Sequence, residues 1–174
     1  MKVIAYDVYQ SEEAMKAGIK FVELDELLKQ SDVVSLHMPA TAVNNHLINA
    51  DKLALMKSTA LLINTARGSL ISVADLIVAL KVGTIGGAGL DVIEGENFMH
   101  LSEEQFLVTG HALEDDAKRA VAIEVLGKMP NAIVTSHNAF NSTEALQRIQ
   151  VTTLANIKAF RAGMPQNTVT SNPN

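Results

Sequence analysis

The stretch ALLINTARGSLISVADLIVALKVG, residues 60–83, decides the fold of this chain. Its opening run is apolar enough for a strand in the middle of a sheet, and its closing run has the amphipathic pattern of a helix that ends before Gly83. Between them lies the segment NTARG, residues 64–68. A guanidinium at the end of a buried strand is costly unless it meets an anion, so Arg67 predicts an anion-binding site.

Strand-like and helix-like runs alternate along the rest of the chain. Strands are predicted at residues 2–8, 19–22, 32–39, 60–66, 85–92 and 132–136. Helices are predicted at residues 12–18, 23–30, 49–57, 73–83, 115–129 and 142–163. This alternation is typical of βαβ units around a parallel sheet, so we predict an α/β, doubly wound fold.

The composition excludes several classes of protein. Hydrophobic residues make up 48% and charged residues 19% of the 174 residues, which indicates a globular chain. The net charge of −5 argues against a nucleic-acid or anionic-membrane partner. The absence of cysteine excludes disulfides and thiolate metal sites, and no run is long and apolar enough to span a membrane. We therefore expect a cytoplasmic protein.

Five of the predicted strands end in a polar side chain or lead directly into one. These side chains are Asp7, His37, Arg67, Asp91 and His137. In parallel sheets, ligands gather at the carboxyl ends of the strands, so we expect a site there. The other histidines, His46, His100 and His111, lack partners at metal-ligand spacing and are interpreted as structural or solvent-exposed, so no metal is predicted.

Two of these side chains have the chemistry of a catalytic site. The planar fork of Arg67 suits a substrate carboxylate, although an ion pair with a nearby acid is an alternative. His137 can exchange a proton near neutral pH, although its position taken alone favours an ordinary loop histidine. A carboxylate partner would fix the tautomer of His137, and the residues alone do not choose between Glu94 and Glu96.

The ordered blocks VIAYD, SDVVSLHMP, NTARGSLI, GAGLDVIEGE, MPNAIVTSHNAF and STEAL cover nearly the whole chain. Through them the chain resembles the D-isomer-specific 2-hydroxyacid dehydrogenases, and within that family the D-lactate dehydrogenase branch. The resemblance implies a truncated Rossmann-like, mostly parallel sheet with helices on both faces. It also implies the cofactor NAD and the interconversion of a 2-oxo acid with a D-2-hydroxy acid, of the pyruvate and D-lactate type.

The resemblance assigns roles to individual residues. Arg67 would anchor the substrate carboxylate and carbonyl, His137 would donate the proton, and Glu96, rather than Glu94, would be the partner of His137. The residues implied in NAD binding are Asp7, Met38, Pro39, Asn44, Thr65, Ala66, Arg67 and Asp91. The partner implied is a small 2-oxo or 2-hydroxy acid.

The sequence also departs from the family pattern. Family members carry a substrate domain and a strand with a G-x-G-x-x-G turn ahead of the strand that VIAYD matches, and this sequence contains no such turn. Ser136 stands where the family usually has proline. We therefore interpret residues 1–163 as a partial NAD-binding domain and residues 164–174 as a polar tail.

A sheet of this order without its central strand leaves two strands with unpaired edges. We expect the two halves to pair directly, or another copy or a separate chain to fill the gap. Three hypotheses follow. The chain is a dehydrogenase that is inactive or weak in isolation, a catalytically dead binding or assembly module, or a half-enzyme that needs a separate N-terminal partner.

Overall fold

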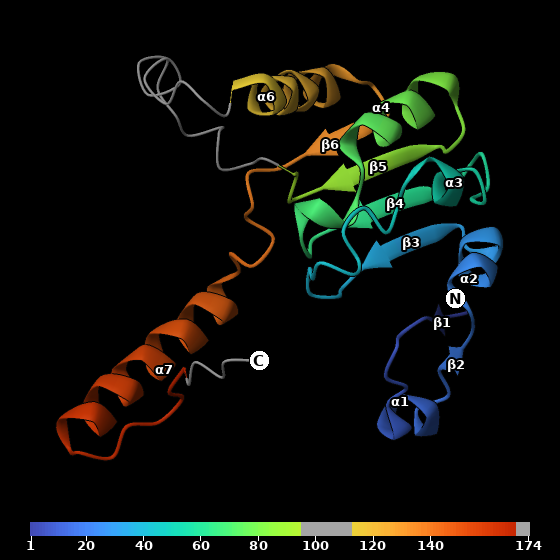
Figure 1. Cartoon of the computed structure of the whole chain (residues 1–174). Coiled ribbons are helices and arrows are strands. Elements are labelled where there is room, and N and C mark those ends of the chain that lie inside the picture. The colour runs from blue at the N-terminus through green and yellow to red at the C-terminus, as the bar shows by residue number, and fades with distance from the viewer. Residues whose placement is uncertain (95–112, 170–174) are drawn as a thin grey trace. The chain divides into compact units, whose positions relative to one another are not determined.

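The computed structural model describes residues 1–94 and 113–169 and divides the chain into two compact units (Figure 1). The first unit is Met1–His137, and the second is Asn138–Asn174. The predicted sheet and all the described candidate site residues belong to the first unit.

The first unit contains two parallel sheets. In the smaller sheet, β1 (Ile4–Ala5) pairs with β2 (Lys20–Phe21). The larger sheet has the order β3-β4-β5-β6, and its strands are β3 (Val33–Leu36), β4 (Leu61–Asn64), β5 (Gly87–Leu90) and β6 (Ala132–Val134). The helical elements are α1 (Glu12–Lys16), α2 (Leu24–Gln30), α3 (Ala50–Leu53), the 3-10 turn η1 (Gly68–Leu70), α4 (Val73–Val82) and α6 (Leu113–Lys128). The predicted parallel, Rossmann-like α/β fold is confirmed.

Of the alternatives expected for the two half-sheets, direct pairing is not found among the described residues. Strand β1 pairs only with β2, and β3 pairs only with β4, in the described part of the chain. Strand β1 is only two residues long, so pairing it with the edge of β3 would form few hydrogen bonds and add little stability. Among the described residues the outer edge of β3 has no strand partner, so its backbone groups are open to another strand.

The core lies on one face of the larger sheet. Alternate residues such as Val34, Leu36 and Leu62 are buried there, because successive side chains of a strand point to opposite faces. Helices α3, α4 and α6 lie along this face (Figure 1). Their buried contributions to the core include Leu53, Leu76, Leu80, Ile123 and Leu126.

The opposite face of the larger sheet is open at several apolar side chains. Val33 is 55%, Leu61 43% and Ile133 71% exposed. Val33 and Leu61 are register partners on neighbouring strands, so their side chains lie side by side. Scattered apolar residues are common on protein surfaces, but neighbours on one sheet face indicate a surface that another element covers.

The helix ends follow the predicted signals. Asn49 caps α3, with its Oδ1 accepting the N–H of Lys52 at 3.1 Å. Gly83 ends α4 with φ of 76°, a conformation that glycine adopts without strain. In the second unit, the long helix α7 (Thr143–Arg161) is capped by Ser142 and buries none of its side chains within that unit. No helix in the described ranges is long and apolar enough to cross a bilayer.

Candidate active site

The carboxyl ends of β4, β5 and β6 are linked by backbone hydrogen bonds. The N–H of Asp91 donates to the carbonyl of Asn64 at 2.9 Å, and the N–H of His137 donates to the carbonyl of Asp91 at 2.9 Å. These bonds extend the sheet ladder into the loops and place three predicted strand ends next to one another. The structure thus brings the loop of Arg67, Asp91 and His137 to one edge of the sheet.

Asn64 shapes the loop that carries Arg67. Its side chain is fully buried, donates through Nδ2 to the carbonyl of Arg67 at 2.9 Å, and accepts the N–H of Ala66 through Oδ1 at 3.1 Å. A buried amide with both ends bonded to one loop fixes that loop, because any other conformation leaves buried polar groups unpaired. The apolar run thus ends on asparagine, whose side chain holds the loop that carries the arginine.

The guanidinium of Arg67 is exposed at the edge of the sheet. Its Nη1 donates to the carbonyl of Ala66 at 2.6 Å. The alternative interpretation, an ion pair with a nearby acid, finds no support among the described residues. The remaining N–H groups of the fork can bind an anion from solvent.

Asp91 and His137 occupy different environments. Asp91 is 5% exposed, and its Oδ1 accepts from the Thr135 hydroxyl at 2.5 Å. His137 is exposed and has φ of 52°, in the left-handed region that residues with a side chain rarely adopt. The predicted contact between His137 and Glu96 involves a residue that lies outside the described part of the chain.

Glu94 has a partner that the sequence did not reveal. Its Oε2 lies 2.8 Å from Nε2 of His46, a residue interpreted from the sequence as structural or solvent-exposed. The two positions are 48 residues apart and belong to loops after different strands. No local pattern predicts such a contact, because it depends on how the two loops meet.

The remaining predicted cofactor residues are distributed over two regions. Asp7 follows β1, and its Oδ1 accepts the N–H of Tyr9 at 2.9 Å in an Asx turn. Asn44 closes the loop after β3 by donating to the carbonyl of Pro39 at 2.8 Å and accepting the N–H of Thr41 at 2.7 Å. Met38 packs against the core, whereas Thr65 is exposed.

Two features of these regions bear on dinucleotide binding. An exposed carboxylate at a strand end, such as Asp7, is a suitable acceptor for ribose hydroxyls. Thr65 and Ala66 lie in the loop that carries Arg67, after β4. The described residues include no glycine-rich turn that leads from a strand into a helix and could bind a pyrophosphate.

Replacing Asn64 with alanine tests the anchoring of the Arg67 loop. We expect the free energy of unfolding to fall by about 2 to 3 kcal/mol, because the loop loses both hydrogen bonds to Asn64 and a fully buried side chain is truncated. Chemical denaturation followed by circular dichroism measures the change. Asn45→Ala, at an exposed position in a loop, is the matched control and should leave stability unchanged. Equal effects of the two substitutions would contradict the anchoring role.

Comparison with known proteins identifies the class. Residues 1–139 match the family described as D-isomer specific 2-hydroxyacid dehydrogenase, NAD binding domain. 2-Hydroxyacid dehydrogenase A of Aspergillus oryzae is 43% identical over 91% of this chain and 43% of its own length. Glycerate dehydrogenase of Methylorubrum extorquens is 41% identical over 97% of this chain and 45% of its own.

A solved structure matches the chain with a comparable identity and coverage. The crystal structure of D-lactate dehydrogenase from Aquifex aeolicus, complexed with NAD and lactic acid, superposes with a TM-score of 0.78. It is 38% identical, over 94% of this chain and 47% of that protein. The chain therefore belongs to the D-isomer-specific 2-hydroxyacid dehydrogenase family, in its NAD-binding domain.

The family assignment confirms the predicted resemblance and, at the level of the family, the predicted cofactor NAD. The chain spans about half the length of the curated relatives it matches, between 43% and 48% for three of them.

Proposed function

We propose that this chain carries the catalytic half-site of an NAD-dependent dehydrogenase that interconverts a 2-oxo acid and a D-2-hydroxy acid, of the pyruvate and D-lactate type. The observation that carries the proposal is the exposed guanidinium of Arg67 on a loop held by buried Asn64. That loop lies at the sheet edge that also bears Asp91 and His137.

Each residue of the half-site has one role in the proposed reaction. Arg67 binds the substrate carboxylate through two parallel N–H donors and orients the adjacent carbonyl. His137 donates a proton to the carbonyl oxygen as charge develops there, and takes it back in the reverse direction. We assign Glu96, by resemblance to the family, as the carboxylate partner that orients the His137 imidazole.

NAD, when bound, supplies or accepts the hydride. Asp7 is proposed to accept hydrogen bonds from the adenosine ribose, and Thr65, Ala66 and Asp91 to line the nicotinamide half. Met38, Pro39 and Asn44 are proposed to form the cofactor-side loop. The Asn44 side chain keeps this loop closed through its bonds to Pro39 and Thr41.

The active form is proposed to contain a further strand and helix between β1 and β3. Two observations support this partner. Strand β3 offers an unpaired parallel edge within the described residues, and the sheet face beside it exposes Val33 and Leu61. A strand followed by an amphipathic helix would pair with the edge and cover the face at once.

Complementation tests the proposal. The chain is mixed with a polypeptide that comprises the part of the Aquifex aeolicus D-lactate dehydrogenase ahead of the matched region. We expect the chain alone to bind NADH weakly, because the described residues provide no pyrophosphate-binding turn. The mixture should bind NADH by calorimetry and oxidise it when pyruvate is added.

The same experiment separates the alternatives. A complex that forms and binds NADH without turnover would mean that the chain is a non-catalytic binding module. Pairing of the chain with a second copy, seen by light scattering before the partner is added, would mean that the edge of β3 serves a homo-oligomer instead. The Arg67→Ala chain in the same mixture shows whether any turnover comes from the proposed site.

A further inference from the structure

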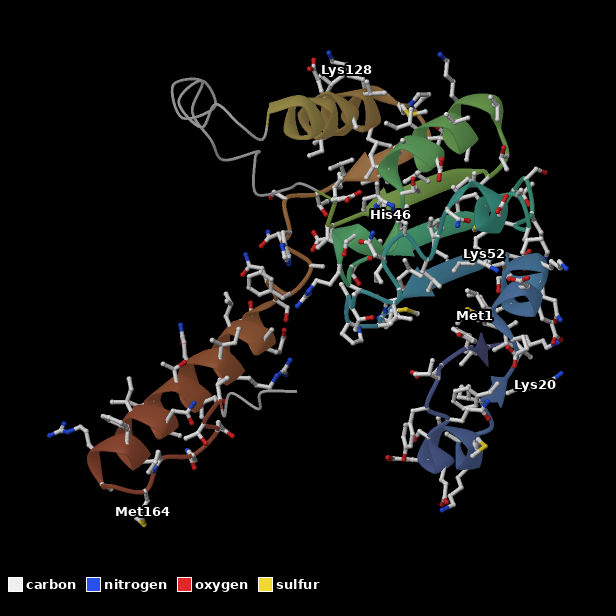
Figure 2. The ribbon with its side chains drawn as sticks, viewed as in Figure 1. Met1, Lys20, His46, Lys52, Lys128 and Met164 are labelled. Atoms are coloured by element: carbon white, nitrogen blue, oxygen red, sulfur yellow. The ribbon has the colours of Figure 1, made fainter. Side chains whose placement is uncertain are left out.

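A histidine and a glutamate from different loops meet at the sheet edge that carries Arg67. Nε2 of His46 lies 2.8 Å from Oε2 of Glu94. The side chain of His46 is 40% exposed and that of Glu94 is 19% exposed, so solvent screens the contact only in part. Figure 2 labels His46, in the loop between β3 and α3. The mechanism proposed above gives this pair no role.

The loop of His46 runs along the turn that follows Arg67. The N–H of His46 donates to the carbonyl of Ser69 at 2.8 Å, and the N–H of Ile48 donates to the carbonyl of Leu70 at 3.0 Å. His46 has φ of 51°, an unfavourable value for a residue with a side chain. Such a conformation persists only where neighbouring contacts hold it, so the contacts of His46 fix this loop.

The loop of Glu94 packs against the same turn. A Cβ atom added to Gly68 would overlap the carbonyl carbon of Ile93 and the amide nitrogen of Glu94, and would lie 2.5 Å from the carbonyl oxygen of Ile93. The backbone at Gly68 is therefore in direct contact with the peptide that leads into Glu94. Only glycine permits this approach without displacing backbone.

We propose that His46 and Glu94 are positioning residues for Arg67. The contact between them closes a ring, in which His46 holds η1 through its backbone and Glu94 holds Gly68 through packing. Arg67 directly precedes Gly68, so the ring fixes the backbone from which the Arg67 side chain extends. The inference rests on the proposed function, in which Arg67 binds the substrate carboxylate.

Two substitutions of His46 form a matched pair for the test, because both place a side chain other than glycine at the positive φ of position 46. His46→Leu removes the hydrogen bond, whereas the Nε2 amide of His46→Gln can still donate to Glu94. In the complemented enzyme we expect His46→Leu to raise KM for pyruvate about ten-fold while KM for NADH stays unchanged. We expect His46→Gln to recover most of this loss. A merely structural residue would alter both constants or neither.

Amide hydrogen exchange of the isolated chain gives a second measurement that needs no turnover. The amides of Ile48 and Leu70 should exchange about ten-fold faster in His46→Leu than in wild type, because the ring opens locally. They should exchange at the wild-type rate in His46→Gln. A complemented wild type without turnover would refute the proposed function, while the exchange rates would still decide whether the ring exists. If the two variants behave alike in both measurements, the positioning role is wrong.

Discussion

Replacing Arg67 with alanine is expected to lower kcat/KM of the complemented enzyme for pyruvate by about 1,000-fold, or about 4 kcal/mol of transition-state stabilisation. The reason is that the guanidinium both binds the carboxylate and orients the carbonyl in the proposed site, so its loss weakens binding and misaligns the reacting group. Steady-state kinetics with NADH and pyruvate measures the change.

Arg67→Lys is the informative control for this prediction. Lysine keeps the charge but not the planar fork, so it should restore attraction for the carboxylate without its orientation. We expect KM to recover more than kcat. Unfolding of either variant at the wild-type denaturant concentration would show that the fold is intact, since Arg67 is exposed. An alanine variant with wild-type kcat/KM would remove Arg67 from the site.

Replacing Gly68 with alanine is expected to destabilise the chain by about 3 kcal/mol, because the new methyl group meets backbone rather than a flexible side chain. The peptide between Ile93 and Glu94 would have to shift, and with it the loop that follows β5. Thermal or chemical unfolding measures the loss directly in the isolated chain.

Gly127→Ala is the matched control for Gly68→Ala. A Cβ atom at Gly127 meets no atom within 4 Å, and the residue lies in the last turn of α6. Alanine is the better helix former, so this variant should be as stable as wild type or slightly more stable. If Gly68→Ala unfolds at the same denaturant concentration as Gly127→Ala, the close contact at Gly68 does not exist in solution.

Most of the fold was predictable from local patterns. The apolar run of residues 60–66 became β4, and the amphipathic run after it became α4, because strand burial and helix periodicity agree with the tertiary structure there. The caps at Asn49 and Gly83 follow from side-chain chemistry and backbone freedom that act within a few residues. Local patterns did not choose between direct pairing of the two half-sheets and a gap between them. The choice depends on how many hydrogen bonds a short strand can form.

The candidate site was predictable only where strand topology determines it. Arg67, Asp91 and His137 each follow a parallel strand, and the carboxyl ends of such strands share one edge. The contact of His46 with Glu94 was not predictable, because it joins two loops and depends on a positive φ at a non-glycine residue. The only related sequence feature was the pair of glutamates after Asp91, which was considered as a source of a partner for His137 and not for His46.

The edge of β3, which is unpaired within the described residues, makes the assembly of the chain depend on its concentration. Two copies that meet at this edge collide at a rate that grows with the square of protein concentration, whereas capture by a partner in excess is first order in the chain. Productive assembly is therefore a kinetic competition, favoured by dilution and by having the partner present from the start. A chain produced alone at high concentration would be driven toward aggregates through the same backbone groups that its partner needs.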